Sequence, residues 1–300
     1  MKQRTITGAI LIALFLPFVI LGGIPYIVLM TIAIGYGMFE LLKATEGKIN
    51  KNDEKKRCLN WPKWILVLII IITMIGSLYP YLVSLINGEG FVFSSISIPV
   101  IPFVILAFLL FSGSIFSEKI NIQDVMMVLG MSTFLMVGGQ SLSLVRDMGG
   151  AFLVFVLLTC FITDAGAYFT GYICSKNFKT HKLNERISPK KTIEGSIGGM
   201  VLGTIIPFLV TLIPLLSLKD DAVFGITLKW WMIIILSFIM TITAQLGDLT
   251  FSAIKRYYDV KDYSQLFPGH GGVLDRFDSI LFNMIFFSVI MMFLSSGTII

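Results

Sequence analysis

Long apolar runs separated by short polar segments repeat along the whole of this 300-residue chain. A bilayer core about 30 Å thick needs about 20 apolar residues to be crossed by a helix. The pattern therefore predicts an all-α, polytopic integral membrane protein with about nine transmembrane helices. The predicted helices cover residues 5–22, 25–43, 64–86, 98–116, 125–145, 150–173, 195–217, 230–250 and 278–298.

The composition supports this fold class. Hydrophobic residues make up 56% of the chain and charged residues 14%, whereas an average soluble domain has about 25% charged residues. A soluble fold of this length has too small an interior for so many apolar side chains. The three cysteines show no CxxC spacing, which argues against a disulfide scaffold.

The basic residues are concentrated in alternate segments between the predicted helices. If the N-terminus is cytoplasmic, 20 of the 23 Lys and Arg residues lie on the cytoplasmic side and 3 lie outside. Basic loops stay in the cytoplasm, so the sequence predicts a cytoplasmic N-terminus in the cell membrane. The same distribution explains the net charge of +5 without nucleic acid as a partner.

Polar residues divide the chain unevenly. The five predicted helices of the N-terminal transmembrane region, 1–145, carry few of them, and Glu40 and Gln140 there are interpreted as helix-packing or helix-end residues. The C-terminal region, 146–300, is predicted to be catalytic and to carry two cytoplasmic loops, 174–194 and 252–277.

One predicted helix carries a polar stripe that membrane lipid would penalise. Its members repeat every three or four residues and fall within about 80° of one helix face. Because charged groups are costly in a bilayer, the stripe predicts a wet site that opens to the cytosol. Lys255 and Arg256 end it, and both are expected at the surface, where an anionic ligand would enter. The stripe consists of Thr241, Gln245, Asp248, Ser252 and Lys255.

Two further segments carry candidate binding residues. Asp164 and Tyr168 share a face of the predicted helix 150–173, and the alternative for Asp164 is an interhelical hydrogen bond. Ser188, Lys190 and Lys191 precede the next helix and form a candidate phosphate site, with a positive-inside anchor as the alternative. Beyond them, Gly195, Gly199 and Gly203 repeat every four residues, which predicts close helix packing.

A glycine-rich turn and an acidic cluster follow the stripe. His270, Gly271 and Gly272 lie in a loop whose amides are expected to be free for phosphate oxygens. Asp275 and Asp278, with Asp248, supply carboxylates of the kind that hard divalent cations prefer. The alternative is structural ion pairing with the nearby cations, which are Lys255, Arg256 and Arg276.

The stretch 252–278 resembles the C-terminal signature of the phosphatidate cytidylyltransferases, also called CDP-diacylglycerol synthases. Its most specific part is Phe-Pro-Gly-His-Gly-Gly-Val-Leu-Asp-Arg-Phe-Asp at 267–278, and none of the 27 positions departs from the signature. The segments 164–168, 188–192 and 245–249 also resemble that family. Before about residue 160 the resemblance depends on hydropathy alone.

The resemblance implies that CTP and phosphatidate react to CDP-diacylglycerol and pyrophosphate, with Mg²⁺ or another divalent cation, and with one metal ion or two. Asp248 and Asp278 are then expected to be the principal metal ligands, with Asp275 third or supporting them. The catalytic set is Ser252, Lys255, Arg256, His270 and Asp275. The substrate-binding set is Asp164, Tyr168, Ser188, Lys190, Lys191, Gly271, Gly272 and Arg276.

The sequence leaves some choices open. It does not distinguish CTP from dCTP, and the family resemblance alone suggests a homodimer among membrane lipids. The alternatives are a CTP-dependent polyprenol or lipid kinase and a cation-coupled transporter, while a purely structural subunit would not explain the cost of the polar stripe.

Overall fold

The computed structural model describes residues 13, 15–45, 63–87, 99–116, 122–177, 179–218, 228–269 and 271–297. The chain forms two compact units, one of residues 1–143 and 254–277, the other of residues 144–253 and 278–300. Helices α5, α8 and α9 each continue from one unit into the other. The first unit therefore combines N-terminal helices with most of the C-terminal signature.

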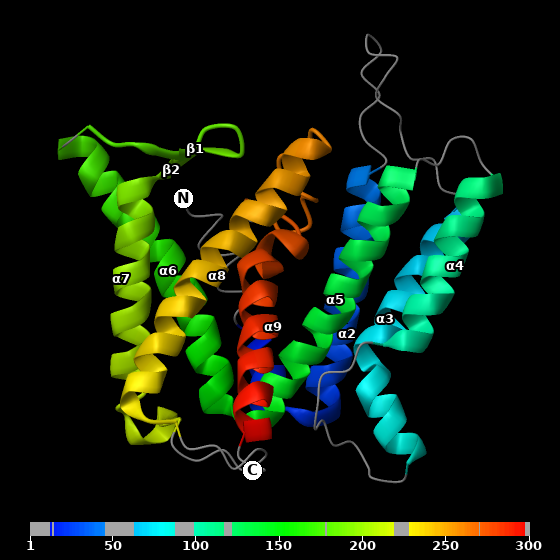
Figure 1. Cartoon of the computed structure of the whole chain (residues 1–300), viewed down its shortest axis with the longest axis horizontal. Coiled ribbons are helices and arrows are strands. Elements are labelled where there is room, and N and C mark those ends of the chain that lie inside the picture. Colours follow the sequence, from blue (N-terminus) through cyan, green and yellow to red (C-terminus); the bar gives the residue numbers. More distant parts are fainter. Residues whose placement is uncertain are drawn as a thin grey trace. The chain divides into compact units, whose positions relative to one another are not determined.

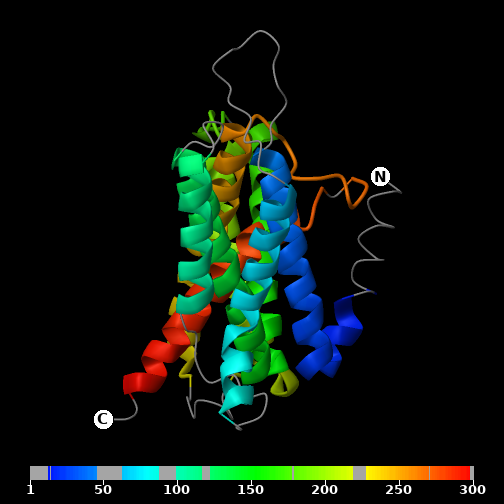
Figure 2. The ribbon, with the colours of Figure 1, turned by 90° about the vertical axis from the view of Figure 1, so that its right-hand side faces the viewer.

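Unit 1 contains four helices of 17 to 27 residues that lie lengthwise beside one another (Figures 1 and 2). Two buried hydrogen bonds connect α5 to its neighbours: Tyr26 Oη donates to the Leu142 carbonyl at 3.2 Å, and Gln140 Nε2 donates to the Gly76 carbonyl at 2.8 Å. The interpretation of Gln140 as a packing residue is thus confirmed. The helices are α2 (Gly23–Thr45), α3 (Lys63–Ile86), α4 (Val100–Phe116) and α5 (Ile122–Met148).

Unit 2 contains the remaining helices and a short β-hairpin. The hairpin pairs Lys182 with Thr192 and Asn184 with Ser188 in antiparallel register, so it is a small exception to the predicted all-α fold. Asn283 of α9 connects three helices, because it accepts from Thr243 of α8 and donates to Cys160 of α6. The elements are α6 (Gly150–Asn177), β1 (Lys182–Asn184), β2 (Ser188–Thr192), α7 (Ile193–Val210), α8 (Trp230–Tyr257) and α9 (Leu274–Gly297).

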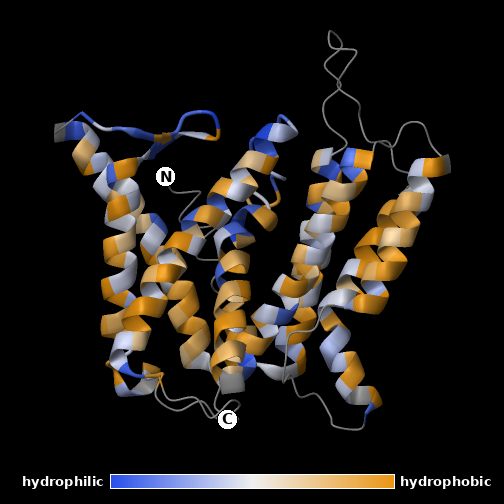
Figure 3. Cartoon of the chain, viewed as in Figure 1, coloured by the Kyte–Doolittle hydropathy of each residue, from blue (hydrophilic) through white to orange (hydrophobic). Residues whose placement is uncertain are grey.

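Seven of the described helices are long and apolar enough to cross a membrane, and α4 is a shorter apolar helix. Of the predicted helix 5–22, residues 13 and 15–22 are described, and 13 and 15–21 are helical, whereas the basic segment 46–62 lies outside the described residues. Exposed apolar side chains on the described helices fit a lipid environment: Phe108 of α4 is 77% exposed and Phe293 of α9 is 78% exposed. Figure 3 shows hydrophobic residues along the helices of each unit and hydrophilic residues at the hairpin.

Three predicted boundaries were wrong. The helix predicted over 195–217 ends at Val210, where Thr211 caps it, and a 3₁₀ turn follows at Pro214–Leu216. The helix predicted over 230–250 continues to Tyr257, because polar side chains lower hydropathy without breaking helical hydrogen bonds. The loop predicted over 252–277 is correspondingly shorter.

The predicted packing of α7 through its glycines is confirmed. A Cβ atom added to Gly195 would lie 2.6 Å from the Ala167 carbonyl oxygen of α6, and one added to Gly199 would lie 2.7 Å from the Thr163 carbonyl oxygen. Gly203 is equally crowded by Thr163. Small residues let two helices approach closely in a membrane, and here they hold α7 and the preceding hairpin against α6.

Residues 258–273, which we call the signature loop, connect α8 to α9 (orange in Figure 2). Asp259 has a φ of 55°, a left-handed conformation that ends a helix. Burial raises the pKa of the neighbouring Tyr258 phenol, and the charge of Asp124 raises it further, so Tyr258 stays neutral. Within the loop, Phe267 N donates to the Gly271 carbonyl at 2.9 Å.

Candidate active site

The polar stripe of α8 faces protein rather than lipid in unit 2. Thr241 is buried, and Gln245 Nε2 donates to the Ser196 carbonyl at 3.2 Å, while the Ser196 hydroxyl donates to the Gln245 side chain. On the other side of the helix, Ile242 and Leu246 are exposed. Thr241 and Gln245 of the predicted stripe thus pack against protein.

Asp248 is held at the centre of this stripe by a lysine of the hairpin. Lys191 Nζ donates to Asp248 Oδ2 in a short ion pair whose side chains are 31% and 25% exposed. Ser252 Oγ lies 3.4 Å from the other carboxylate oxygen. The structure therefore brings together three predicted site residues, and the Lys191 side chain stays partly exposed.

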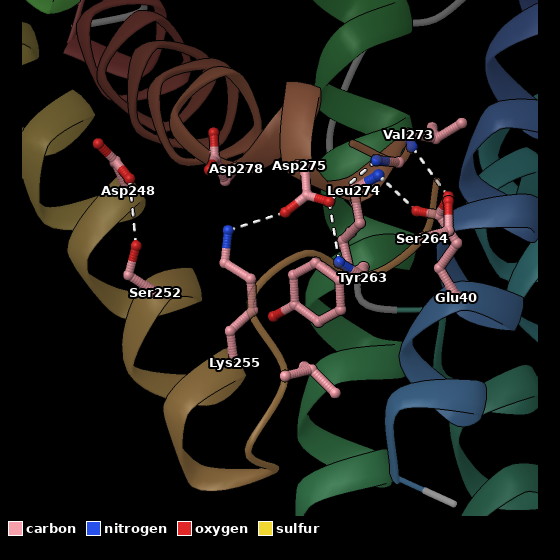
Figure 4. A network of polar contacts seen from close by, with 12 residues as sticks. Glu40, Asp248, Ser252, Lys255, Tyr263, Ser264, Val273, Leu274, Asp275 and Asp278 are labelled. Carbon is pink, nitrogen blue, oxygen red and sulfur yellow. Dashed lines mark hydrogen bonds and ion pairs between the residues drawn. The ribbon is translucent and has the colours of Figure 1, made fainter. Parts of the chain in front are cut away.

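Asp278 belongs to the same unit. A Cβ added to Gly247 of α8 would lie 2.9 Å from the Phe282 side chain of α9, so Asp248 and Asp278 occupy neighbouring helices, each within about one turn of that contact. Figure 4 shows both carboxylates. Cys160 Sγ of α6 lies 3.9 Å from the carbonyl oxygen of Ser279, the residue that follows Asp278, which places α6 near the same region.

The carboxylates do not form a ready-made metal cluster. Among the described residues, no group of three or more His, Cys, Asp or Glu side chains is arranged to hold a metal ion. Asp248 is instead paired with Lys191, and Asp278 Oδ1 accepts from the Ser279 amide at 2.7 Å. Asp248 thus forms an ion pair, but its partner is Lys191 and not one of the cations expected from the sequence.

A second group of polar residues lies within unit 1 (Figure 4). Lys255 Nζ donates to Asp275 Oδ1 at 2.8 Å, and the ammonium lies 5.4 Å from the centre of the Tyr263 ring. The two charged side chains are only 12% and 4% exposed. The expectation that Lys255 lies at the surface was wrong, because α8 continues and the signature loop covers this lysine.

Asp275 also organises the signature loop. Its Oδ2 accepts from the amides of Tyr263 and Gly272, each at 2.9 Å. Gly271 has a φ of 78°, and a Cβ there would lie 2.7 Å from Asp275 Oδ2. The Gly272 amide is therefore used within the protein rather than left free for phosphate, contrary to the sequence interpretation. His270 lies outside the described residues.

Glu40 is a member of this group that the sequence interpretation treated as a packing or helix-end residue. It is fully buried in α2, and its carboxylate accepts from the amides of Val273 at 3.0 Å and Leu274 at 2.8 Å. The Ser264 hydroxyl donates to it as well. The available signal was a single carboxylate inside a long apolar helix, which is costly without partners.

The other predicted residues lie on β2, α6 and α8. Ser188 and Lys190 lie on β2 with Lys191, and Lys190 is exposed. Asp164 and Tyr168 lie on exposed positions of α6. Arg256 is exposed at the end of α8, where Nη1 donates to the Val260 carbonyl at 3.4 Å.

Comparison with known proteins points to a single family. The sequence profile of the cytidylyltransferase family matches residues 2–294. A protein of Staphylococcus haemolyticus named phosphatidate cytidylyltransferase is 31% identical over 283 residues, which cover 94% of this chain and 95% of that protein. A Bacillus subtilis protein of the same name is 30% identical over 287 residues, covering 95% and 96%.

Proposed function

Because the chain belongs to the cytidylyltransferase family, we propose that this nucleotidyltransferase transfers CMP from CTP to phosphatidate in the membrane. The products would be CDP-diacylglycerol and pyrophosphate. The observation that carries the proposal is the polar stripe on α8, where an otherwise apolar helix places Asp248 against Lys191 of the hairpin. Acidic and basic groups in this combination suit a polyphosphate and the metal ion that accompanies it.

The reaction needs positioning more than covalent help. An oxygen of the phosphatidate phosphate attacks the α-phosphorus of CTP and forms the new P–O bond. The bond between the α-phosphorus and the oxygen bridging to the β-phosphate breaks, and pyrophosphate leaves with that electron pair. Because the attacking phosphate is already ionised at neutral pH, the site requires no strong general base.

The basic side chains would neutralise the phosphates. Lys191 is half-buried beside Asp248 and can donate to a phosphate oxygen while one of its protons stays on the carboxylate. Lys255 lies two turns along α8 and would serve the nucleotide phosphates, with the exposed Arg256 next to it. Ser252, one turn after Asp248 on α8, would donate its hydroxyl to a phosphate oxygen.

The donor set fits a magnesium ion. Mg²⁺ is commonly bound by one or two carboxylates together with substrate phosphates and water, and Asp248 and Asp278 offer two carboxylates on neighbouring helices. When bound, the metal would supply positive charge to the triphosphate. Asp275 already accepts three hydrogen bonds, which favours a supporting role for it over direct ligation.

The direct test is to incubate the purified protein with CTP, phosphatidate and Mg²⁺. We expect a CDP-lipid and pyrophosphate in equal amounts, and no product when diacylglycerol replaces phosphatidate, because diacylglycerol lacks the ionised phosphate. Phosphorylation of a polyprenol by CTP without pyrophosphate release would instead identify a lipid kinase.

We also propose that the site opens to the cytosol, where CTP is found. In a cysteine-free protein, new cysteines near residues 56, 184 and 265 should react with an impermeant thiol reagent from the cytosolic side. Cysteines near residues 89 and 221 should react from outside, since basic segments stay inside. Labelling of position 265 from outside would place the signature loop away from CTP and contradict the proposal.

A further inference from the structure

Glu40 holds the start of α9 from a distant part of the chain. Its two carboxylate oxygens accept from the amides of Val273 and Leu274, which are 233 and 234 positions later, and from the Ser264 hydroxyl, 224 positions later. The first amides of a helix have no partner inside that helix. The carboxylate therefore satisfies two such donors and places a negative charge at the positive end of α9.

The Glu40 carboxylate occupies the space that a side chain at position 272 would need. A Cβ atom added there would lie 2.5 Å from Glu40 Oε2 and 2.6 Å from Glu40 Cδ. Gly272 does not have a left-handed φ, so an alanine could adopt its backbone conformation. Space for Glu40 explains why no side chain is present, whereas the sequence interpretation assigned Gly272 to substrate binding.

Two carboxylates thus fix the signature loop together. Asp275 binds the amides of Tyr263 and Gly272, while Glu40 binds the two amides that follow Gly272 and the hydroxyl that follows Tyr263. Asp275 also orients Lys255. A shift of the loop away from Glu40 would move Asp275 and, through it, the ammonium of Lys255 (Figure 4).

We propose that Glu40 is a positioning residue that fixes the signature loop, and that Gly272 is small in order to admit the Glu40 carboxylate. The inference rests on the proposed function in one respect: the affected lysine is assigned there to the phosphates of CTP. Glu40 would touch neither substrate. It would connect the N-terminal helices, which otherwise carry few polar residues, to the reaction.

The first experiment measures the loop without relying on activity. In a cysteine-free background, Val273→Cys places a thiol at a position that is 7% exposed. Adding Glu40→Gln, which keeps size but removes the charge and one acceptor oxygen, should speed thiol labelling in detergent about 10-fold or more, and lower turnover at saturating substrates by a similar factor.

Gln140→Ala is the matched control. This side chain is also fully buried in unit 1, and it donates to the Gly76 carbonyl of α3. Labelling and turnover should stay within about 2-fold of the parent, because the substitution leaves the bonds from Glu40 to the signature loop in place. Unchanged labelling in Glu40→Gln, or equal acceleration in the control, would overturn the proposal. If the parent makes no CDP-lipid, the proposed function fails while the labelling comparison still decides the role of Glu40.

The second experiment tests whether position 272 needs a glycine because of Glu40 or because of a substrate. Gly272→Ala should lower turnover, since its methyl group meets the carboxylate. Adding Glu40→Asp withdraws the carboxylate by one methylene group, so the double variant should be more active than Gly272→Ala alone. A double variant no more active than Gly272→Ala would contradict this half of the inference. It would instead support a role for Gly272 in binding the nucleotide.

Discussion

Replacement of Asp248 or Asp278 by asparagine is expected to lower CDP-lipid formation at least about 100-fold, with the protein still inserted in the membrane. Asparagine keeps the size of each side chain but removes the charge that would bind a divalent cation. Asp248 and Asp278 lie on neighbouring helices, so each substitution removes one of two carboxylates from the same region. Turnover at saturating CTP, phosphatidate and Mg²⁺ measures the effect, and gel filtration of the purified variants checks folding.

The control for these variants is Glu185→Gln, which neutralises an exposed carboxylate in the turn of the β-hairpin. It changes the net charge by the same amount on the hairpin that carries Lys191 and should leave turnover within about 2-fold, because exposed charges contribute little. The concentration of Mg²⁺ needed for half-maximal activity should rise in Asp248→Asn and Asp278→Asn. Near-normal turnover in both variants would refute the assignment of these carboxylates to the metal.

The helix pattern and the stripe on α8 could be predicted because both depend on local geometry. Side chains three or four positions apart share a helix face whatever the rest of the chain does, so Gln245 and Asp248 had to point together. The glycines of α7 were predictable for the same reason. Hydropathy placed the end of α8 too early, since it measures lipid preference, and the helix continues through its polar residues to Tyr257.

The partners of the site residues could not be predicted, because they come from distant segments. Nothing in the sequence near Glu40 indicates that its carboxylate binds amides more than 230 positions away. The pairing of Lys191 with Asp248 depends equally on how the hairpin lies over α8. Both sets of residues looked unusual in an apolar chain, so sequence identified the polar groups, and packing decided which of them meet.

Replacement of Lys255 by alanine should damage both stability and catalysis. Asp275, 4% exposed, would lose its cation while its charge remains buried, and breaking such a pair by removing one partner costs about 3–5 kcal/mol. Removal of a surface lysine would cost almost no stability. Thermal unfolding in detergent should therefore show a clearly lower midpoint for Lys255→Ala than for Lys261→Ala, which removes an exposed lysine of the signature loop.

The double variant Lys255→Met with Asp275→Asn separates the two roles. It removes both charges, so no unpaired buried charge remains, and the unfolding midpoint should recover much of the loss. Activity should not recover, because the cation proposed to neutralise the CTP phosphates is still missing. Recovery of turnover along with stability would show that Lys255 acts only as the structural partner of Asp275.

Substrate kinetics then decide which ligand Lys255 serves. It lies at the end of α8 that the proposed orientation places nearest the cytosol, about 10 Å along the helix from Asp248 at 1.5 Å per residue. CTP arrives from the cytosol, whereas the phosphatidate headgroup is held at the bilayer surface by its acyl chains. The residual activity of Lys255→Ala should therefore show a raised KM for CTP, or a lower kcat, with a smaller change in the phosphatidate dependence in mixed micelles. A change confined to the phosphatidate dependence would reverse the two substrates along α8, with the lipid phosphate beside Lys255.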